Sequence, residues 1–100
     1  MLRVCACVCD AGLRVVKDNM LPVPPLFRLI HECSGTAWSE MYKVFNCGHR
    51  LELYVPPEHA QQVIDVSAKF GIAAQVIGRV EAKEGKPEVV VKSEHGEFTY

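Results

Sequence analysis

Proline placement constrains the fold of this chain more than any other feature. Five of its six prolines stand in two tight groups, at positions 22, 24 and 25 and at positions 56 and 57. Proline fixes φ and lacks an amide hydrogen, so it suits the first turn of a helix but not a helix interior or a central strand. Each group therefore separates two elements. We treat residues 1–12 as a poorly defined head and residues 13–100 as one partial domain.

Two helices are predicted after the first proline group. Apolar residues recur at i, i+3, i+4 and i+7 over residues 24–33, which is the period of one helical face. Ser34 and Gly35 end this helix, and Thr36 is expected to cap a second helix that stops at residues 46–48. The residues that share a face are Leu26, Leu29, Ile30 and Cys33 in the first helix and Ala37, Met41, Val44 and Phe45 in the second.

A strand–helix–strand unit is predicted next. Residues 49–55 carry apolar side chains at every second position, which indicates a strand buried on one side, with Arg50, Glu52 and Tyr54 on the solvated side. Residues 57–70 predict a helix, and residues 73–82 predict a second strand. Such a βαβ crossover is right-handed and places its helix on one face of the sheet.

The residues after this crossover are predicted to form the edge of the same sheet. Residues 83–87 form a turn, so the strand at 88–93 should run antiparallel to the one before it, and residues 98–100 form a last short strand. We therefore predict an α+β fold, a mixed β-sheet with a βαβ crossover and covering helices. The second face of the sheet needs a cover, which the early helices, a missing domain or a partner chain would supply.

Composition excludes several classes of function. Eleven basic residues stand against twelve acidic ones, and a net charge of −1 lacks the clustered cations that nucleic-acid binding needs. The apolar runs are far shorter than the roughly 20 residues that cross a bilayer, and the first residues lack the pattern of a signal peptide. We expect a cytoplasmic protein with no nucleic-acid and no membrane partner.

The head is marked by Cys5, Cys7 and Cys9. Its apolar runs 4–9 and 13–16 flank a turn-like interval and predict a weak hairpin. Three thiols on one side of a strand suit a soft metal, but a fourth ligand is missing. Five cysteines without a C-x-x-C pair are typical of free thiols in a reducing compartment. We favour buried thiols or a disordered start over a metal site.

No autonomous catalytic site is visible in the sequence. The chain has no phosphate-binding loop, dinucleotide fingerprint, nucleophile elbow or zinc-protease motif. Cys47 and His49 could form a nucleophile–base couple, but nothing nearby would activate the thiol, so we interpret Cys47 as a packing residue. Gly48 and Gly78 have two interpretations each. In the first interpretation Gly48 is a helix cap and Gly78 is a packing notch. In the second, each is a place where a ligand approaches the backbone.

Three motifs, in order and spacing, carry a family resemblance. They lie at residues 21–27 (LPVPPLF), 40–48 (EMYKVFNCG) and 76–81 (VIGRVE). Together they resemble the closing part of aminoimidazole ribonucleotide synthase, also called phosphoribosylformylglycinamidine cyclo-ligase. The resemblance covers residues 13–100, and three motifs in register are more specific than any one of them.

This resemblance implies a two-domain enzyme that uses ATP to activate the amide oxygen of formylglycinamidine ribonucleotide, so that an internal nitrogen closes the imidazole ring. The products would be aminoimidazole ribonucleotide, ADP and phosphate. Such phosphoryl transfer needs charge neutralisation, usually by Mg²⁺, and positioning of two ends of one substrate. The resemblance implies that the nucleotide and metal ligands lie largely in the N-terminal domain, so we assign no catalytic residue and no metal ligand to this chain.

The resemblance also implies site residues in this chain. Phe45, Asn46 and Gly48 match the family's Phe-Asn-x-Gly segment beside the cleft between domains, and Gly78 and Arg79 match its Ile-Gly-x-Val strand. These five residues are expected to shape the cleft for substrate and nucleotide. Asn46 would donate a side-chain hydrogen bond to a ligand oxygen, and Gly48 would let the backbone come close.

Two departures from the family shape the functional hypothesis. Cys47 replaces the usual Met, and Arg50 replaces a second glycine, which should stiffen the loop. The glycine-rich opening of the family's domain is absent, so the chain is expected to start inside that domain. We expect a cyclo-ligase fragment that is inactive alone, needs an N-terminal domain or chain, and self-associates. The alternatives are a stand-alone nucleotide-binding or regulatory module without catalysis and a thiol metal-binding protein.

Overall fold

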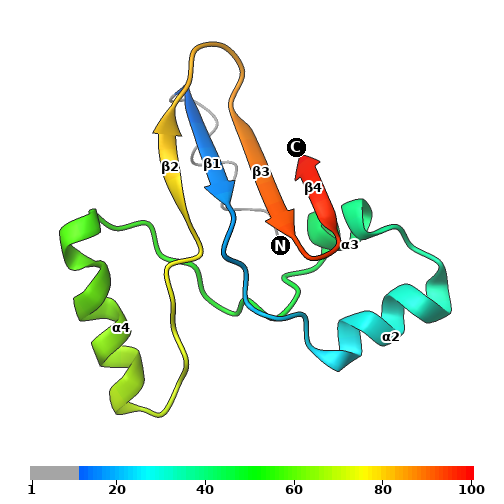
Figure 1. The fold of residues 1–100 in the computed structure, drawn as a ribbon, viewed down its shortest axis with the longest axis horizontal. Helices are drawn as coiled ribbons and strands as arrows, with labels where there is room; N and C mark the ends of the chain where they lie inside the picture. Colours follow the sequence, from blue (N-terminus) through cyan, green and yellow to red (C-terminus); the bar gives the residue numbers. More distant parts are fainter. Residues whose placement is uncertain (1–11) are drawn as a thin grey trace.

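The computed structural model describes residues 12–100, which form a small mixed α/β unit around a four-stranded sheet (Figure 1). The general α+β class is as predicted. The predicted hairpin partner at 4–9 and Cys5, Cys7 and Cys9 lie outside the described residues. The strands are β1 (Leu13–Lys17), β2 (Gly78–Ala82), β3 (Glu88–Ser93) and β4 (Gly96–Thr99), and the helices are α2 (Pro25–Ser34), α3 (Trp38–Val44), the 3-10 helix η1 (Pro57–His59) and α4 (Ala60–Lys69).

The first strand of the sheet lies at its centre. The strand order is β2-β1-β3-β4, with β1 antiparallel to β2 and parallel to β3. Val15 stands opposite Val80 on one side and Val89 on the other. β2 and β3 therefore run in opposite directions, as their short connection predicts, but they are not hydrogen-bonded neighbours because β1 lies between them.

The predicted crossover between residues 49 and 82 is wrong. Residues 49–55 form no strand, and the predicted strand at 73–82 is regular only over Gly78–Ala82. β2 pairs with β1 instead, and residues 49–55 do not join the four-stranded sheet of the described residues. The burial of residues 49–55 also differs from the prediction, since Leu51 and Leu53 are exposed and Glu52 is only partly exposed, whereas Arg50 and Tyr54 are exposed as predicted.

The two proline groups begin helices as predicted. Pro25 is the first residue of α2, which ends where Gly35, at φ 68°, donates its amide hydrogen to the carbonyl of His31. Thr36 does not cap α3. Ala37 precedes that helix without a side-chain cap, and Thr36 Oγ1 instead accepts a hydrogen bond from Ser34 Oγ at 2.7 Å. The sequence pattern predicted the boundary between α2 and α3 correctly, but it placed the cap of α3 one residue too early.

The core joins α3 to one face of the sheet. Tyr42 and Cys47 pack with Val15, Val89 and Val91, and the ring of Phe98 approaches that of Tyr42 with centroids 5.9 Å apart. Val23, from the proline segment, completes the cluster. The α3 residues Met41 and Tyr42 are the only two helical residues that are buried among those described, so α3 is the helix that anchors the sheet.

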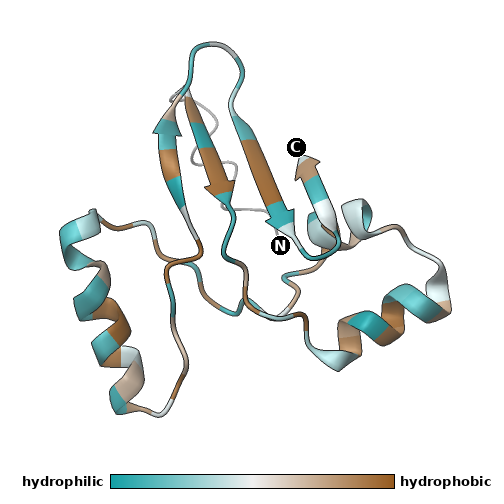
Figure 2. Ribbon diagram, viewed as in Figure 1, coloured by the Kyte–Doolittle hydropathy of each residue, from teal (hydrophilic) through white to brown (hydrophobic). Residues whose placement is uncertain are grey.

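Residues 51–77 contact the sheet region only near their two ends, at Glu52 and at residues 75–77, and their middle part, which contains α4, stands away from the strands. We call this segment the arm (Figure 1). None of the α4 side chains is buried, and Figure 2 shows apolar residues on this helix at a distance from the strands. The molecule measures 41 × 40 × 20 Å with a radius of gyration of 14.4 Å, against about 13 Å for a compact domain of this length. The fold is therefore open on the side of the arm.

Candidate functional site

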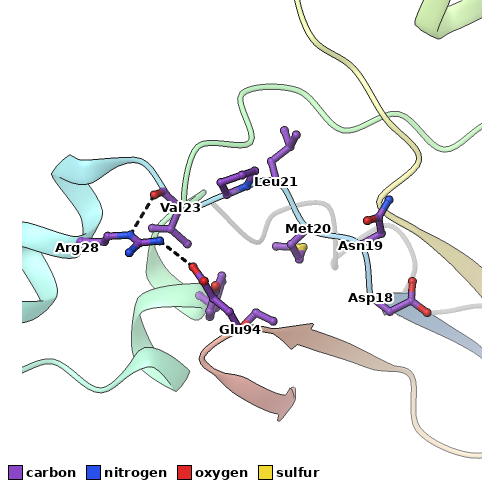
Figure 3. Close-up of a pocket in the computed structure, with 10 residues that line it drawn as sticks. Asp18, Asn19, Met20, Leu21, Val23, Arg28 and Glu94 are labelled. Carbon is purple, nitrogen blue, oxygen red and sulfur yellow. Dashed lines mark hydrogen bonds and ion pairs between the residues drawn. The ribbon is translucent and has the colours of Figure 1, made fainter.

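A groove follows the segment that leaves β1 (Figure 3). Residues 18–23 form one wall, Arg28 comes from α2, Tyr42 from α3, and residues 93–94 from the end of β3. The groove has a volume of about 320 Å³. β1 ends at Lys17, and the amides of Asp18 and Asn19 both donate to the carbonyl oxygen of Ile77. Further along the wall, Pro22 has no amide hydrogen and could not continue a central strand.

Two ion pairs lie at the groove. Arg28 Nη2 lies 2.9 Å from Glu94 Oε1, and Arg28 Nε donates to the carbonyl oxygen of Val23 at 3.4 Å (Figure 3). Arg79 Nη1 lies 2.5 Å from Asp18 Oδ2. All four charged side chains are more than a third exposed, so the pairs contribute little to stability. They place donors and acceptors in fixed positions at the rim.

A less exposed polar network supports the groove wall from behind. His49, only 7% exposed, accepts the amide hydrogen of Leu21 at Nε2 over 3.2 Å. Its Nδ1 lies 3.3 Å from Glu52 Oε1, and Lys17 Nζ lies 2.7 Å from Glu52 Oε2. The hydrogen bond from Leu21 indicates the tautomer with a proton on Nδ1, which then donates to Glu52. The network thus ties β1, the wall and residues 49–52 together.

The network holds Glu52 in its charged form. The hydrogen bond from His49 is the largest cause, and with Lys17 it lowers the pKa of Glu52 from 4.5 to about 2, against the opposing effect of burial. A carboxylate that accepts two hydrogen bonds of this kind is stabilised relative to its protonated form. Glu52 is therefore ionised throughout the neutral pH range, and in this form it holds His49 behind the groove wall.

The predicted residues of the Phe-Asn-x-Gly segment form a tight turn after α3. Asn46 Oδ1 accepts the amide hydrogen of Gly48 at 3.0 Å, and Cys47 and Gly48 have φ values of 48° and 100°. A Cβ at position 48 would lie 2.8 Å from Pro24, so glycine is required there. Phe45 packs against Phe27, with ring centroids 5.9 Å apart. No described residue bonds the Nδ2 group of Asn46, which stays available as a donor.

The predicted residues of the Ile-Gly-x-Val strand lie at the start of β2. A Cβ on Gly78 would lie 1.9 Å from the carbonyl oxygen of Val16, so this glycine lets β2 approach β1. That contact supports the packing interpretation of Gly78. Arg79 holds Asp18 at the groove rim and also lies 2.6 Å from Glu81.

The two groups of predicted residues meet opposite ends of the same segment. Gly78 and Arg79 contact residues 16–18, and Gly48 contacts Pro24. No hydrogen bond or ion pair joins Asn46 to Arg79 within residues 12–100, and none of the five predicted residues is among those that line the groove. Their role in a cleft between domains stays a prediction.

The described residues offer binding groups rather than a reactive couple. Burial raises the pKa of the Cys47 thiol, whose Sγ lies 3.8 Å from the carbonyl oxygen of Met41. His49 is engaged by Leu21 and Glu52, so it does not activate this thiol. Among residues 12–100 no group of three or more His, Cys, Asp or Glu side chains could hold a metal ion.

Comparison with known proteins decides the family. The family model described as "AIR synthase related protein, C-terminal domain" matches residues 4–92. The chain belongs to that family.

Curated relatives agree with this assignment. Phosphoribosylformylglycinamidine cyclo-ligase from Myxococcus xanthus (strain DK1622) is 35% identical over 85 residues, which are 85% of this chain and 25% of that protein. The cyclo-ligase of Methanopyrus kandleri is 36% identical over 83 residues, or 83% and 23%. That of Burkholderia cenocepacia is 38% identical over 82 residues, or 80% and 23%. The chain spans about a quarter of the length of these relatives.

In this member of the AIR synthase related family, two residues of the network behind the groove wall were not predicted from the sequence. Glu52 was assigned to a solvated strand face, and Lys17 was not singled out, yet both lie behind the groove wall with His49. Position 49 lies in the loop where this chain departs from the Gly-x-Gly pattern of the family. A histidine and a glutamate three residues apart were the only local signal, and their partners lie about 30 residues away in the chain.

Proposed function

We propose that this chain is the C-terminal part of an ATP-dependent cyclo-ligase, which converts formylglycinamidine ribonucleotide to aminoimidazole ribonucleotide in purine biosynthesis. The observation that carries the proposal is the match to phosphoribosylformylglycinamidine cyclo-ligases over most of this chain. The shared name of these relatives supports the reaction, and the quarter-length match supports a partial contribution by this chain.

The proposed chemistry divides between this chain and the rest of the enzyme. ATP transfers its γ-phosphoryl group to the amide oxygen of the substrate, an internal nitrogen attacks the activated carbon, and the ring closes as phosphate leaves. ATP and Mg²⁺ are held largely by the part of the enzyme that the relatives have and this chain does not contain. Mg²⁺ would neutralise charge on the transferred group. Phe45, Asn46, Gly48, Gly78 and Arg79 shape this chain's wall of the cleft.

The proposed partner is an N-terminal domain or chain of the same enzyme type. Its contact would cover apolar surface that the arm leaves exposed. None of the helices within residues 12–100 has the length and apolar character needed to cross a lipid bilayer. We propose the cytoplasm as its compartment, because Cys33 and Cys47 are free thiols.

Complementation tests the proposal. The 100-residue chain is mixed with a version of the Myxococcus xanthus cyclo-ligase that lacks the quarter matched here, and ATP-dependent ring closure is measured. We expect neither protein to turn over alone and the mixture to do so. A well-folded complex of the two that stays inactive would contradict the proposal.

A second measurement distinguishes the proposed cyclo-ligase role from the alternative of a stand-alone module. Calorimetry of the isolated chain with ATP should show no tight binding, because the proposed nucleotide ligands lie elsewhere. Tight binding of ATP by the chain alone would favour a nucleotide-binding or regulatory module without catalysis.

Asn46→Ala in the active mixture should raise KM for the ribonucleotide, whereas Ser67→Ala on α4 should not.

A further inference from the structure

Three aromatic rings stack where α2, α3 and the turn after β3 meet. The indole of Trp38 lies between the imidazoles of His31 and His95, with ring centroids 4.4 Å and 3.7 Å away. We call these three residues the ring stack. The ring of His95 is almost parallel to that of Trp38, at an angle of 3°. This flat contact would place a protonated imidazole over the face of an indole, which is the best cation–π partner among the side chains.

His95 also presents an unpaired nitrogen to a carboxylate. Within residues 12–100, its Nε2 atom is buried and has no hydrogen-bond partner, yet this atom lies 3.3 Å from Glu94 Oε1. The two atoms are within ion-pair distance but are not aligned as a hydrogen bond. In the protonated ring both nitrogens are donors, and a hydrogen bond between charged groups is stronger than one between neutral groups. A small rotation of the exposed Glu94 side chain would then align the pair.

The same carboxylate oxygen also serves the groove. Glu94 Oε1 lies 2.9 Å from Arg28 Nη2, in the ion pair that Figure 3 shows at the rim. The side chains of Arg28 and Glu94 are 48% and 57% exposed, so water and salt weaken their attraction. The side chain of His95 is only 19% exposed, so its charged form would attract the oxygen through a less polar medium. One oxygen therefore has two competing partners, and the charge on His95 decides between them.

We propose that the ring stack is a pH-dependent latch. A proton on His95 adds an ion pair with Glu94 and a cation–π contact with Trp38, and these contacts fasten the turn after β3 to α3. The carboxylate then turns away from Arg28, whose guanidinium becomes available to an anion at the groove. Histidine is the side chain whose charge ordinarily changes between about pH 5 and 8. The latch goes beyond the proposed function, because it needs neither ATP nor ribonucleotide.

The neighbouring charged groups fix the sign of this response. On α2, Arg28 and a protonated His31 would oppose a further positive charge. On α3, burial raises the pKa of Tyr42 above its usual value of 10, so its phenol stays neutral over the range of the latch. The remaining charged side chains near the turn pair with one another, Lys92 with Glu97 and Lys43 with Glu40. In the described part of the chain, Glu94 is thus the carboxylate that pairs with His95.

Fluorescence of the 100-residue chain tests the latch, because Trp38 is its single tryptophan. A protonated imidazole in contact with indole quenches its emission by accepting an electron from the excited ring. Emission should therefore fall as the pH is lowered from about 8 to about 5. His95→Gln should remove most of this fall. His59→Gln, on the exposed η1, should keep it.

The hairpin offers a matched control for the carboxylate. Glu94→Gln should move the midpoint of the fluorescence change to lower pH, because a carboxylate beside the ring favours its charged form. Glu97 on β4 is 59% exposed, almost the same as Glu94, but it pairs with Lys92. Glu97→Gln should leave the midpoint where it is.

Sulfate probes the release of Arg28, because this ion keeps its two negative charges over the whole range. Its dissociation constant is measured from the NMR signal of the Arg28 Nε–H group. Sulfate should bind about two- to fivefold more tightly at the acid end, which is the effect of losing one exposed ion pair. Most of this gain should disappear in His95→Gln. An absence of any gain in the parent chain would contradict the release of Arg28.

Other outcomes would overturn the inference. Emission that is independent of pH would mean that no charged ring forms against Trp38. A fall that His31→Gln removes and His95→Gln keeps would assign the effect to α2. A midpoint that Glu94→Gln does not move would exclude the ion pair. Circular dichroism checks each fold, and should His95→Gln lose its fold, the exposed Glu94→Gln change decides alone. Complementation of ring closure is a separate measurement, so failure of the latch does not imply failure of the cyclo-ligase role.

Discussion

At the scale of single residues, a few buried polar and glycine positions control the groove. His49 is the one buried polar residue within residues 12–100, and its two ring nitrogens connect the amide of Leu21 to Glu52. Loss of one member of such a network leaves another without a partner, which costs more than the bond itself contributes. The network should therefore respond strongly to pH and to substitution.

Glu52 gives a stability change at acid pH. Its pKa is about 2 in the folded chain and 4.5 as an ordinary carboxyl. The folded value is the lower one, so its stabilisation is complete above about pH 5 and is lost as the pH falls toward 2, with a total of about 3 kcal/mol. Denaturant unfolding at a series of pH values should show this loss.

The conservative variant isolates this effect. Glu52→Gln should be less stable than the parent at pH 7 and should lose most of the stability change between pH 5 and pH 2. Glu58→Gln, on exposed η1, should keep the parent's profile. An unchanged profile in the Glu52 variant would mean that the carboxylate is not held by Lys17 and His49.

Gly78 gives a packing prediction. Gly78→Ala places a methyl group against the backbone of β1, with its carbon 1.9 Å from the Val16 carbonyl oxygen, so the two strands must separate. We expect a loss of about 3 kcal/mol or more in unfolding free energy, at the upper end for overpacking. Val80→Ala, on the same strand and 45% exposed, should cost less than about 1 kcal/mol. Equal costs would argue against the close strand approach.

At the scale of elements, local signals predicted the helices well and the sheet poorly. Proline groups and helical periods located α2 and α4, and the turn at 83–87 located the start of β3. The alternation at 49–55 predicted a strand that the structure does not contain. A period of two identifies a chain that can pair but not its partner, and here β2 pairs with β1, which comes from the start of the described chain.

The structure predicts that α4 is only marginally stable. It has ten residues and no buried side chain, and isolated helices shorter than about 12–15 residues are marginal in water. Its amide hydrogens should exchange far faster than that of Val90, which is 1% exposed at the centre of the sheet. Exchange measured by NMR at low protein concentration tests this. Equal protection would mean that α4 is packed against another part of the chain.

At the scale of the whole molecule, the open shape agrees with a partial contribution to a larger protein. Exposed apolar side chains gather on the arm, and Figure 2 shows apolar positions along α4, whose ribbon stands clear of the sheet. The residues of the candidate site divide into those that the sequence predicts and those that it does not. Sequence resemblance selected Gly48 and Gly78, which the structure shows to be required by close contacts, but the groove and its supporting network depend on partners far apart in the chain.

The exposed arm should be detectable with an apolar dye. Anilinonaphthalene sulfonate should fluoresce with the native chain at low concentration, because clustered apolar side chains bind it. The signal should fall when the shortened Myxococcus xanthus cyclo-ligase is added and covers the arm. Absence of any signal from the native chain would indicate that the arm is already covered.

The central position of β1 also governs how the chain is made. Leu13 pairs with Ala82, and Val15 pairs with Val89, so both neighbours of this strand lie about 70 residues further along the chain. Contacts of such long sequence separation form slowly. The valines of β1 therefore leave the ribosome well before the strands that cover them, and the sheet forms only after β2 and β3 have followed.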